Sequence, residues 1–297
     1  MNSKTVVYKN VEGCDIKADI YWDPDVIEEE TAPVIIWIHG GALIGGKRDN
    51  ISRDHLFWYL SAGYVLISID YRLAPETKVS GIIEDLQDAF KWVSKSAKDH
   101  APIDPTRVVV VGHSAGGYLA LMSGFCVDPL PSAIVSFYGY GDFIGWYDTP
   151  DEFYLKQPIV TREQAYEAIG PGPTTGDNRV ERGAFYLYCR QQGIWTQEVV
   201  GVNPVKNPSG LDPYCPLRNV TSNFPPTLLI HGVNDMDVPI KQAELMAEKL
   251  ANAGVEYQFI PVQGAGHGFD GGGILNPTVS KCLSQVVEFL GKHAKSD

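Results

Sequence analysis

The amino-acid sequence predicts an α/β fold built on a mainly parallel sheet with helices on both faces. Three observations lead to this prediction. Short apolar runs of strand-like composition recur along the chain, segments with helical periodicity lie between them, and the runs are nearly continuous in β-branched residues. Continuous apolar strands are typical of sheets buried on both faces, and alternating strands and helices are typical of parallel sheets.

The first thirty residues predict a different pairing. Residues 5–11 (TVVYKNV) and 15–22 (DIKADIYW) alternate apolar and polar side chains, and a turn around Glu12 and Gly13 separates them. Alternation indicates a strand that is buried on one face only. We therefore expect an antiparallel ribbon at one edge of the sheet.

The buried strands and two helices follow from periodicity. Residues 80–97 place a set of apolar side chains on one helical face, and residues 240–254 are predicted to do the same and to stop at Gly254. The faces comprise Ile82, Leu86, Ala89, Phe90 and Val93 in the first helix, and Ile240, Leu245 and Leu250 in the second. The predicted strands are 34–38, 64–69, 107–112, 133–138, 227–232 and 257–262.

One long segment interrupts this alternation. Residues 140–224 contain no clear strand, are rich in aromatic side chains and include a helix-like piece at 184–192. Long insertions in compact α/β domains usually cover the working end of the sheet. We interpret the segment as an inserted cap rather than a loop packed on the core, which leaves 1–139 and 225–297 as the core.

Composition and charge exclude several classes of protein. The chain has 297 residues, 44% of them hydrophobic, and a net charge of −12, which disfavours a nucleic-acid-binding surface. No run is apolar enough for a membrane span, and the N-terminus lacks a signal-peptide core. Five scattered cysteines without a CxxC pair predict reduced thiols in a cytoplasmic protein, with no disulfide framework and no zinc site.

The motif GHSAG, residues 112–116, identifies a candidate nucleophile. Four valines precede it and a helix-like segment follows it. A serine at such a strand–turn–helix crossing adopts a strained backbone conformation, and small residues at 112 and 116 allow the strand and the helix to approach each other. The hydroxyl of Ser114 is then exposed at the carboxyl edge of the sheet, where open α/β sheets bind ligands.

A second glycine loop, HGGALIGG at 39–46, follows the strand 34–38. It matches GxxxxGK of a phosphate-binding loop, but Arg48 stands where that motif requires Ser or Thr. We therefore interpret the loop as an oxyanion site, in which the amides of Gly41 and Ala42 act together with the amide of Ala115 after the nucleophile.

A serine nucleophile needs a base and an acid to orient that base. With the chain order nucleophile, acid, histidine, only His267 and His293 follow the candidate acids. His293 lies in a charged tail, whereas His267 lies in a glycine-flanked loop after a strand, so we predict His267 as the base. For the acid, Asp235 ranks ahead of Asp237, which we expect to cap a helix, and Asp142 ranks third.

These motifs identify a family. The chain resembles the α/β-hydrolase superfamily, specifically the hormone-sensitive-lipase-like carboxylesterases and their bacterial and fungal relatives. Five motifs appear in the expected order between about residues 34 and 290: HGGA (39–42), DYRLAPE (70–76), GHSAGG (112–117), HGxxDxxVP (231–239) and GHGF (266–269).

The resemblance implies an α/β-hydrolase fold with an eight-stranded, mainly parallel sheet. It also implies the roles of the site residues: an oxyanion hole at Gly40, Gly41 and Ala42, and a triad of Ser114, Asp235 and His267. Three features depart from the family. Ala42 replaces the third glycine, His113 replaces an aspartate that is common there, and the extra residues lie at 140–224 instead of in N-terminal helices.

The sequence therefore predicts a serine carboxylester hydrolase that acts on small to medium esters, with no cofactor and no metal. An arylformamidase, an amide or acyl-peptide hydrolase, and a sugar acetylesterase would use the same triad. A ligand binder without activity is the candidate from another class, although such binders typically lose a triad residue. The expected partner is a small-molecule ester, and a homodimer is left open.

Overall fold

The structure is a computed structural model that describes residues 1–178 and 181–294. The predicted cap and the second core segment include residues 179–180 and 295–297, respectively, which lie outside the described residues. Within the described part, eight strands form one sheet in the order β1-β2-β4-β3-β5-β6-β7-β8. They are β1 Asn2–Val11, β2 Cys14–Trp22, β3 Ala32–Ile38, β4 Val65–Ile69, β5 Ile103–His113, β6 Ala133–Phe137, β7 Thr227–Gly232 and β8 Tyr257–Val262.

The predicted edge ribbon is confirmed. Strands β1 and β2 pair antiparallel, and β2 pairs antiparallel with β4. Between β1 and β2, Glu12 and Gly13 have φ values of 51° and 83°, as a two-residue hairpin turn with the twist of its strands requires. From β4 onward across the sheet, all pairs are parallel.

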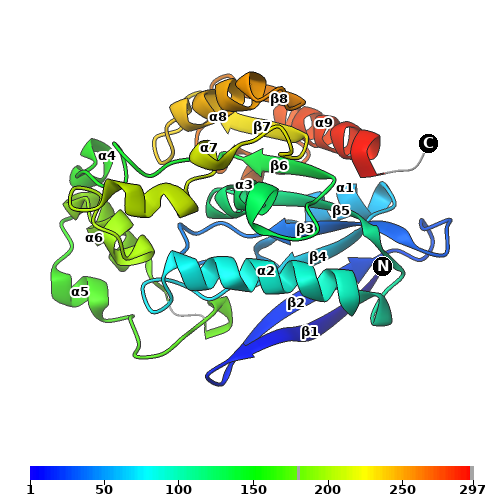
Figure 1. The fold of residues 1–297 in the computed structure, drawn as a ribbon, viewed down its shortest axis with the longest axis horizontal. Coiled ribbons are helices and arrows are strands. Elements are labelled where there is room, and N and C mark those ends of the chain that lie inside the picture. Colours follow the sequence, from blue (N-terminus) through cyan, green and yellow to red (C-terminus); the bar gives the residue numbers. More distant parts are fainter. Residues whose placement is uncertain (179–180, 295–297) are drawn as a thin grey trace.

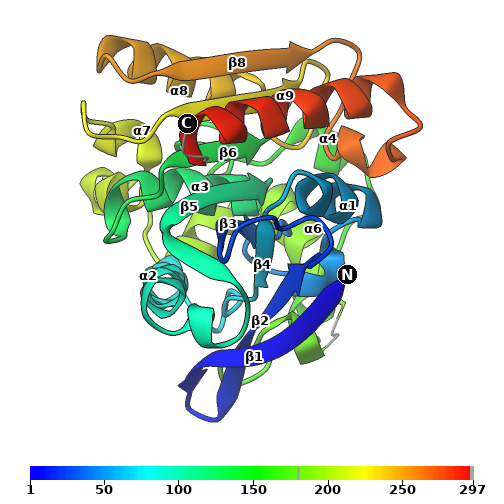
Figure 2. The same cartoon turned by 90° about the vertical axis from the view of Figure 1, so that its right-hand side faces the viewer.

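Helices cover both faces of the sheet, as predicted (Figures 1 and 2). On β3, Val34, Ile36 and Ile38 pack into one apolar cluster with α2, α3 and α8, whereas Ile35 and Trp37 pack into another with α1 and α9. Alternate side chains of a strand point to opposite faces, so β3 is buried twice. The helices are α1 Arg53–Ser61, α2 Val79–Lys95, α3 Ala115–Cys126, α8 Lys241–Asn252 and α9 Pro277–Ala294.

The two helices predicted from periodicity differ in outcome. In α2, all five predicted side chains are buried. In α8, Leu250 is buried, but the rest of the buried apolar face is Ala243, Met246 and Ala247, and Leu245 lies at its margin. The predicted set was wrong because positions five residues apart are about 140° apart around a helix with 3.6 residues per turn.

The segment between β6 and β7 contains short helices and no strand in its described part. It includes α4 Glu152–Leu155, α5 Arg162–Tyr166, α6 Gly183–Gln192 and α7 Pro216–Asn219, with short turns η3 Gly176–Asn178, η4 Thr196–Val200 and η5 Pro208–Tyr214. Figure 1 shows α4 and α6 beyond the ends to which the arrows of β6 and β7 point. Three further short turns are η1 Arg48–Asn50, η2 Ala97–Asp99 and η6 Phe269–Gly272.

Aromatic side chains of this segment belong to the apolar cluster that covers one face of the sheet. The rings of Trp146 and Tyr147 stack with centroids 3.7 Å apart, and Tyr147 stacks on Trp195 at 4.1 Å. The indole of Trp195 donates a hydrogen bond to the carbonyl of Ala42 at 3.1 Å. The segment is therefore packed directly against the loop that follows β3.

Among the helices of the described residues, none combines the length and apolarity needed to cross a bilayer.

Candidate active site

Ser114 lies on the turn between β5 and α3 with φ 56° and ψ −118°. A non-glycine residue with positive φ is strained, and such strain persists only where the surroundings impose it. The surroundings here are close: a Cβ on Gly112 would lie 2.0 Å from the carbonyl oxygen of Gly116, and a Cβ on Gly116 would lie 2.0 Å from that of Ile38. Small residues at both positions are therefore a steric requirement of this turn.

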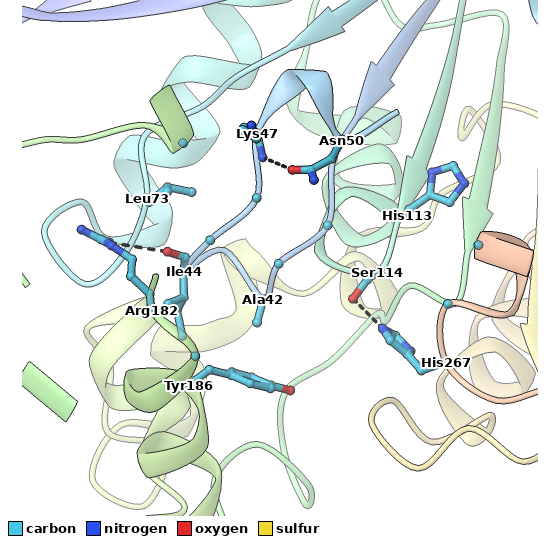
Figure 3. A pocket seen from close by; sticks show the side chains of 18 of the residues that line it. Ala42, Ile44, Lys47, Asn50, Leu73, His113, Ser114, Arg182, Tyr186 and His267 are labelled. Carbon is cyan, nitrogen blue, oxygen red and sulfur yellow. Dashed lines mark hydrogen bonds between the residues drawn. The ribbon is translucent and has the colours of Figure 1, made fainter. Parts of the chain in front are cut away.

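His267 lies within hydrogen-bonding distance of both Ser114 and Asp235. Nε2 of His267 is 2.9 Å from Oγ of Ser114 (Figure 3), and Nδ1 of His267 is 2.7 Å from Oδ2 of Asp235. Because a carboxylate only accepts, Nδ1 carries the proton and donates to Asp235, which leaves Nε2 to accept the serine hydroxyl. Asp235 follows β7 and His267 follows β8, so the parallel sheet brings both to one edge.

Asp235 is held by more than the imidazole. Its Oδ1 accepts the backbone N–H groups of Asp237 and Val238, each at 2.9 Å, and Nε2 of His231 lies 3.2 Å from its Oδ2. Burial alone would raise the pKa of this carboxyl, but the bonds from His231, His267 and Val238 hold it well below its usual range. Asp235 therefore stays ionised while its orientation is fixed.

The pKa of His267 is raised. Burial lowers it, but the hydrogen bond to Asp235 and the negative charges of Asp237, Asp235 and Asp270 outweigh that effect. An imidazolium next to several carboxylates is stabilised by their charge. The site is thus arranged to accept a proton on Nε2.

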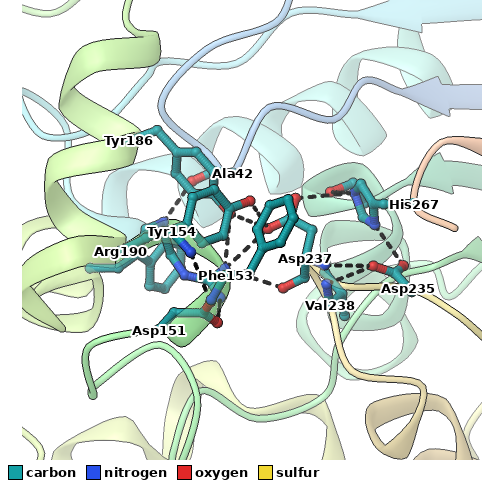
Figure 4. Close-up of polar contacts among 12 residues, drawn as sticks. Ala42, Asp151, Phe153, Tyr154, Tyr186, Arg190, Asp235, Asp237, Val238 and His267 are labelled. Atoms are coloured by element: carbon teal, nitrogen blue, oxygen red, sulfur yellow. Dashed lines mark hydrogen bonds and ion pairs between the residues drawn. The ribbon is translucent and has the colours of Figure 1, made fainter. Parts of the chain in front are cut away.

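Asp237 does not cap a helix, which corrects the expectation from its position. Asp235 accepts the turn N–H groups instead, and α8 begins only at Lys241. Oδ1 of Asp237 accepts from the hydroxyls of Tyr154 and Tyr186 and from the guanidinium of Arg190 (Figure 4). Its Oδ2 lies 3.6 Å from Nε2 of His267, so a second carboxylate faces the candidate base.

The third-ranked acid and the second histidine candidate lie away from the triad. Asp142 pairs with the guanidinium of Arg218 at 2.8 Å, and His293 lies 3.4 Å from Glu256. Neither has a contact with Ser114 or His267 among the described residues.

The loop after β3 adopts an unusual backbone. Gly41, Ala42 and Leu43 have φ values of 114°, 55° and 62°. A Cβ on Gly40 would lie 2.8 Å from the carbonyl oxygen of His113 and 3.1 Å from Cβ of Ser114, so the loop passes directly against the candidate nucleophile.

The free amides of this loop could hold an oxyanion. In the described part of the chain, the N–H groups of Gly41 and Ala42 donate to no backbone acceptor. Ala115 is the first residue of α3, and the first N–H groups of a helix have no acceptor within it. Gly40, Gly41 and Ala42 line the same pocket as Ser114, and the oxyanion hole that they would form with Ala115 stays a prediction.

A hydrogen-bonded layer below the loop supports it. Nδ1 of His39 donates to the carbonyl of Gly40 at 2.8 Å, and the His39 ring stacks on Tyr71 with centroids 4.2 Å apart. The Tyr71 hydroxyl donates to the carbonyl of His39 at 3.0 Å. Burial lowers the pKa of His39 to about 4, so its imidazole is neutral and acts through shape and hydrogen bonding.

Ser114 and His267 open into a pocket of about 790 Å³. Its walls come from the loop 40–47, from the ends of β5 and β6, from η6, and from residues 174–186 of the inserted segment. Figure 3 shows Tyr186 reaching from α6 toward Ser114 and His267. This volume is typical of a site for one small organic molecule.

Sequence reasoning missed several residues of this pocket. Tyr138 packs against His267 with centroids 4.6 Å apart and donates to Asp270, which follows His267 by three positions. Tyr186 and Arg190 contact Asp237 from α6. The neighbourhood of His267 could have drawn attention to Asp270, but no local pattern marks Tyr186 or Arg190.

Comparison with known proteins shows the family to which this chain belongs. A family model described as alpha/beta hydrolase fold matches residues 35–271. Among curated proteins, the non-reducing polyketide synthases Preu6 of Preussia isomera and ascC of Acremonium egyptiacum are 33% and 30% identical, each over 90% of this chain. The chain spans 14% of the length of each of these relatives.

Solved structures share the fold. A protein of unknown function from Staphylococcus aureus aligns with a TM-score of 0.79 at 24% identity, over 99% of this chain and 100% of that one. An α/β hydrolase superfamily protein from Enterococcus faecalis aligns with 0.74 at 22%, over 98% of each chain. Thermogutta terrifontis esterase 2, phosphonylated by sarin, aligns with 0.70 at 23%, over 98% of this chain and 94% of that one. Because the family model extends over most of the sequence, from 35 to 271, the chain belongs to the α/β hydrolase fold family.

Proposed function

We propose that this chain is a serine carboxylester hydrolase that acts on small to medium esters. The observation that carries the proposal is the line of hydrogen bonds from Ser114 through His267 to Asp235, which ends at a strained serine in a pocket. Such a line is the arrangement that activates a serine hydroxyl for acyl transfer.

The proposed mechanism has two halves. Oγ of Ser114 attacks the ester carbonyl while its proton moves to Nε2 of His267, and the amides of Gly41, Ala42 and Ala115 stabilise the oxyanion. Collapse of this intermediate passes the proton from His267 to the departing alcohol and leaves an acyl-enzyme. Water then gives its proton to His267 and attacks the acyl group, which leaves as a carboxylic acid while Ser114 recovers its proton.

The inserted segment 140–224 serves as the cap in this proposal. Thr174, Thr175 and Tyr186 from it line the pocket opposite the core, so its side chains would shape the acyl and alcohol sites. The homodimer and the cytoplasmic location remain predictions.

A panel of nitrophenyl esters of increasing acyl length tests the proposal. We expect turnover by the wild type, and a loss of at least about 10⁴-fold in Ser114→Ala because the nucleophile is removed. Ser209→Ala, which removes an exposed serine hydroxyl, is the matched control and should retain activity. Equal turnover by wild type and Ser114→Ala would refute the proposal.

A serine-reactive phosphonate distinguishes the hydrolase from a ligand binder on the same fold. Labelling confined to Ser114 is the expected result, and the phosphonylated esterase from Thermogutta terrifontis supports this choice of probe. An arylformamidase, an amide or acyl-peptide hydrolase or a sugar acetylesterase would also be labelled. Matched ester, anilide, formanilide and acetylated-sugar substrates separate these three from an esterase.

The curated relatives favour a second candidate function, cleavage of an ester or thioester of a polyketide acyl chain. The supporting observation is the match of nearly the whole chain to a segment of non-reducing polyketide synthases. Aromatic acyl thioesters as substrates test it. Hydrolysis of simple alkyl esters with no turnover of the aromatic thioesters would count against it.

A further inference from the structure

Three buried side chains converge beside the candidate active site without taking part in the proposed triad. His55 comes from α1, His113 from the end of β5, and Asp270 from η6. Their exposed fractions are 3%, 7% and 6%, and one ligand atom from each lies within 4.8 Å of the other two. All three line the same pocket as Ser114.

The distances are those of ligands around an ion. Nε2 of His55 and Nε2 of His113 lie 3.2 and 3.1 Å from the same atom, Oδ2 of Asp270. Bonds of about 2.0–2.1 Å from Zn²⁺ to nitrogen or oxygen place tetrahedral ligands about 3.3 Å apart. Both distances to Oδ2 of Asp270 therefore match edges of one coordination polyhedron, and the three ligand atoms lie within 4.8 Å of one another.

The direction of the rings supports the same arrangement. Neither Nε2 atom has a hydrogen-bond partner in the described part of the chain, although the carboxylate oxygen is close enough. Oδ2 of Asp270 therefore does not lie along the direction in which the Nε2–H bond of either imidazole would point. Two buried nitrogens without an aligned hydrogen bond are costly to keep, and an ion bonded to both would satisfy them.

The charge of the pocket wall also favours a cation. Oδ1 of Asp270 accepts from the hydroxyl of Tyr138 at 2.5 Å, whereas Oδ2 faces the two imidazoles. No Lys or Arg of the described residues forms an ion pair with Asp270. A buried carboxylate needs a compensating charge, and two imidazoles with one carboxylate are ligands that first-row transition metals prefer.

We propose that His55, His113 and Asp270 bind a divalent transition-metal ion of the Zn²⁺ class. The remaining coordination positions face the pocket, where they take water or an oxygen atom of a bound ligand. The ion joins α1 and β5 to the loop that carries His267, because Asp270 follows His267 by three residues. The three ligands are widely separated along the chain, which is why sequence spacing predicts no metal site.

Metal analysis of the full chain tests this proposal. The protein is prepared without a polyhistidine tag, incubated with Zn²⁺, desalted and analysed by mass spectrometry of the metal. We expect about one equivalent per chain, as three protein ligands and an open position bind Zn²⁺ in other proteins. His55→Asn and Asp270→Asn should bind at least about tenfold more weakly, since even loss of an outer partner of a ligand costs that much.

His293→Asn is the matched control, because its imidazole pairs with Glu256 and is not part of the cluster, and it should retain the ion. Zn²⁺ should raise the unfolding temperature of wild type and of this control but not of Asp270→Asn. Much less than one equivalent in wild type, or binding that persists in both ligand variants, overturns the proposal.

A Co²⁺ titration of wild type gives a result even if the variants fail to fold. Strong visible absorption that saturates at one equivalent is expected for a site of low coordination number with imidazole ligands. Weak absorption that does not saturate means adventitious surface binding and also overturns the proposal.

Discussion

One imidazole, that of His267, faces two carboxylates with different tasks. Asp235 accepts from Nδ1 and is itself held by two backbone N–H groups, so it orients the ring. Asp237 faces Nε2 with Oδ2, while the donors from α4 and α6 occupy its Oδ1. Its position suits stabilisation of the imidazolium rather than orientation of the ring.

The pH dependence of kcat/KM is the first prediction. If His267 is the base, it acts only when it is neutral. Because its pKa is raised, activity should then fall on the acidic side at a pH above the ordinary histidine value of about 6.5. Asp237→Asn removes a negative charge near Nε2 of His267. This variant should therefore lose activity at a lower pH than wild type, so that the acidic limb of its pH profile is shifted to lower pH. Hydrolysis rates between about pH 5 and pH 9 measure it.

Asp142→Asn is the control for this prediction, because Asp142 pairs with Arg218 away from His267. The acidic limb of the pH profile of this variant should coincide with that of wild type. An unshifted limb in Asp237→Asn would show that Asp237 has no electrostatic effect on the base.

The second prediction concerns the loop after β3. Gly40→Ala introduces a Cβ 2.8 Å from the carbonyl oxygen of His113 and 3.1 Å from Cβ of Ser114, so the loop must move away from the nucleophile. If its amides stabilise the oxyanion, kcat should fall by about 10²–10³-fold, with a smaller change in KM. Steady-state kinetics on one nitrophenyl ester measure both.

Gly45→Ala lies in the same loop, and its Cβ meets no atom within 4 Å. It should retain nearly full kcat. Equal losses in the two variants would indicate a general effect on the loop and contradict the specific role of Gly40.

At the scale of elements, Arg190 joins the inserted segment to the loop after β7. Its guanidinium bonds Asp151 and Asp237 and lies 4.7 Å from the ring centroids of Tyr147 and Tyr154. The side chain is 1% exposed, so its charge depends on these partners. Helix α6 thereby sets the position of Asp237 beside His267.

The third prediction follows from that contact. Arg190→Ala leaves the carboxylates of Asp151 and Asp237 without their buried partner and should lower the free energy of unfolding by about 3 kcal/mol. Urea denaturation measures the change. Arg162→Ala is the control: Arg162 is exposed and contacts the ring of Tyr166, so its loss should cost less than about 1 kcal/mol. Equal losses of unfolding free energy in the two variants would contradict a stabilising role for the contacts of Arg190 with Asp151 and Asp237.

At the scale of the whole molecule, Arg48 joins three parts of the chain. It pairs with Asp19 on β2, with Asp70 after β4, and with Asp177 in the inserted segment. Lys17 reaches the same Asp177 at 2.7 Å. Arg48 and Lys17 therefore meet at the carboxylate of Asp177, which joins the inserted segment to the core.

Loss of stability in acid is the fourth prediction. Burial raises the pKa of Asp177, but the bonds from Lys17 and Arg48 outweigh it and the pKa is lowered; that of Asp235 is lowered too. A lowered pKa in the folded state gives stability that is present above the unfolded value of about 3.9 and is lost as pH falls below it. Urea unfolding at about pH 7 and pH 3 measures the loss.

Asp177→Asn should be less stable than wild type at about pH 7, and this difference should be smaller at about pH 3, because the pH has then fallen below the unfolded value of about 3.9 toward the lowered pKa of Asp177. A constant difference between the two proteins at both pH values would contradict this assignment.

Much of the fold was predictable because its signals are local. The strand runs, the hairpin at Glu12 and Gly13, and the buried face of α2 each follow from a repeat within a few residues. The turn at Ser114 was predictable for the same reason, since small residues at 112 and 116 are required by the crossing itself. Helix α8 shows the limit, because its buried face is Ala243, Met246, Ala247 and Leu250, whereas the large apolar side chain of Leu245 lies at the margin of that face.

By itself, the sequence determined where strands and helices follow one another along the chain. It also determined the strained turn at the serine and the glycine loop, because short-range sterics and periodicity dictate these features. Only the tertiary structure decided that Asp235 both orients His267 and holds its own turn, that α6 brings Arg190 to Asp237, and that His55, His113 and Asp270 meet. The physical reason is that these contacts join segments far apart in the chain, and packing of the whole sheet sets their distances.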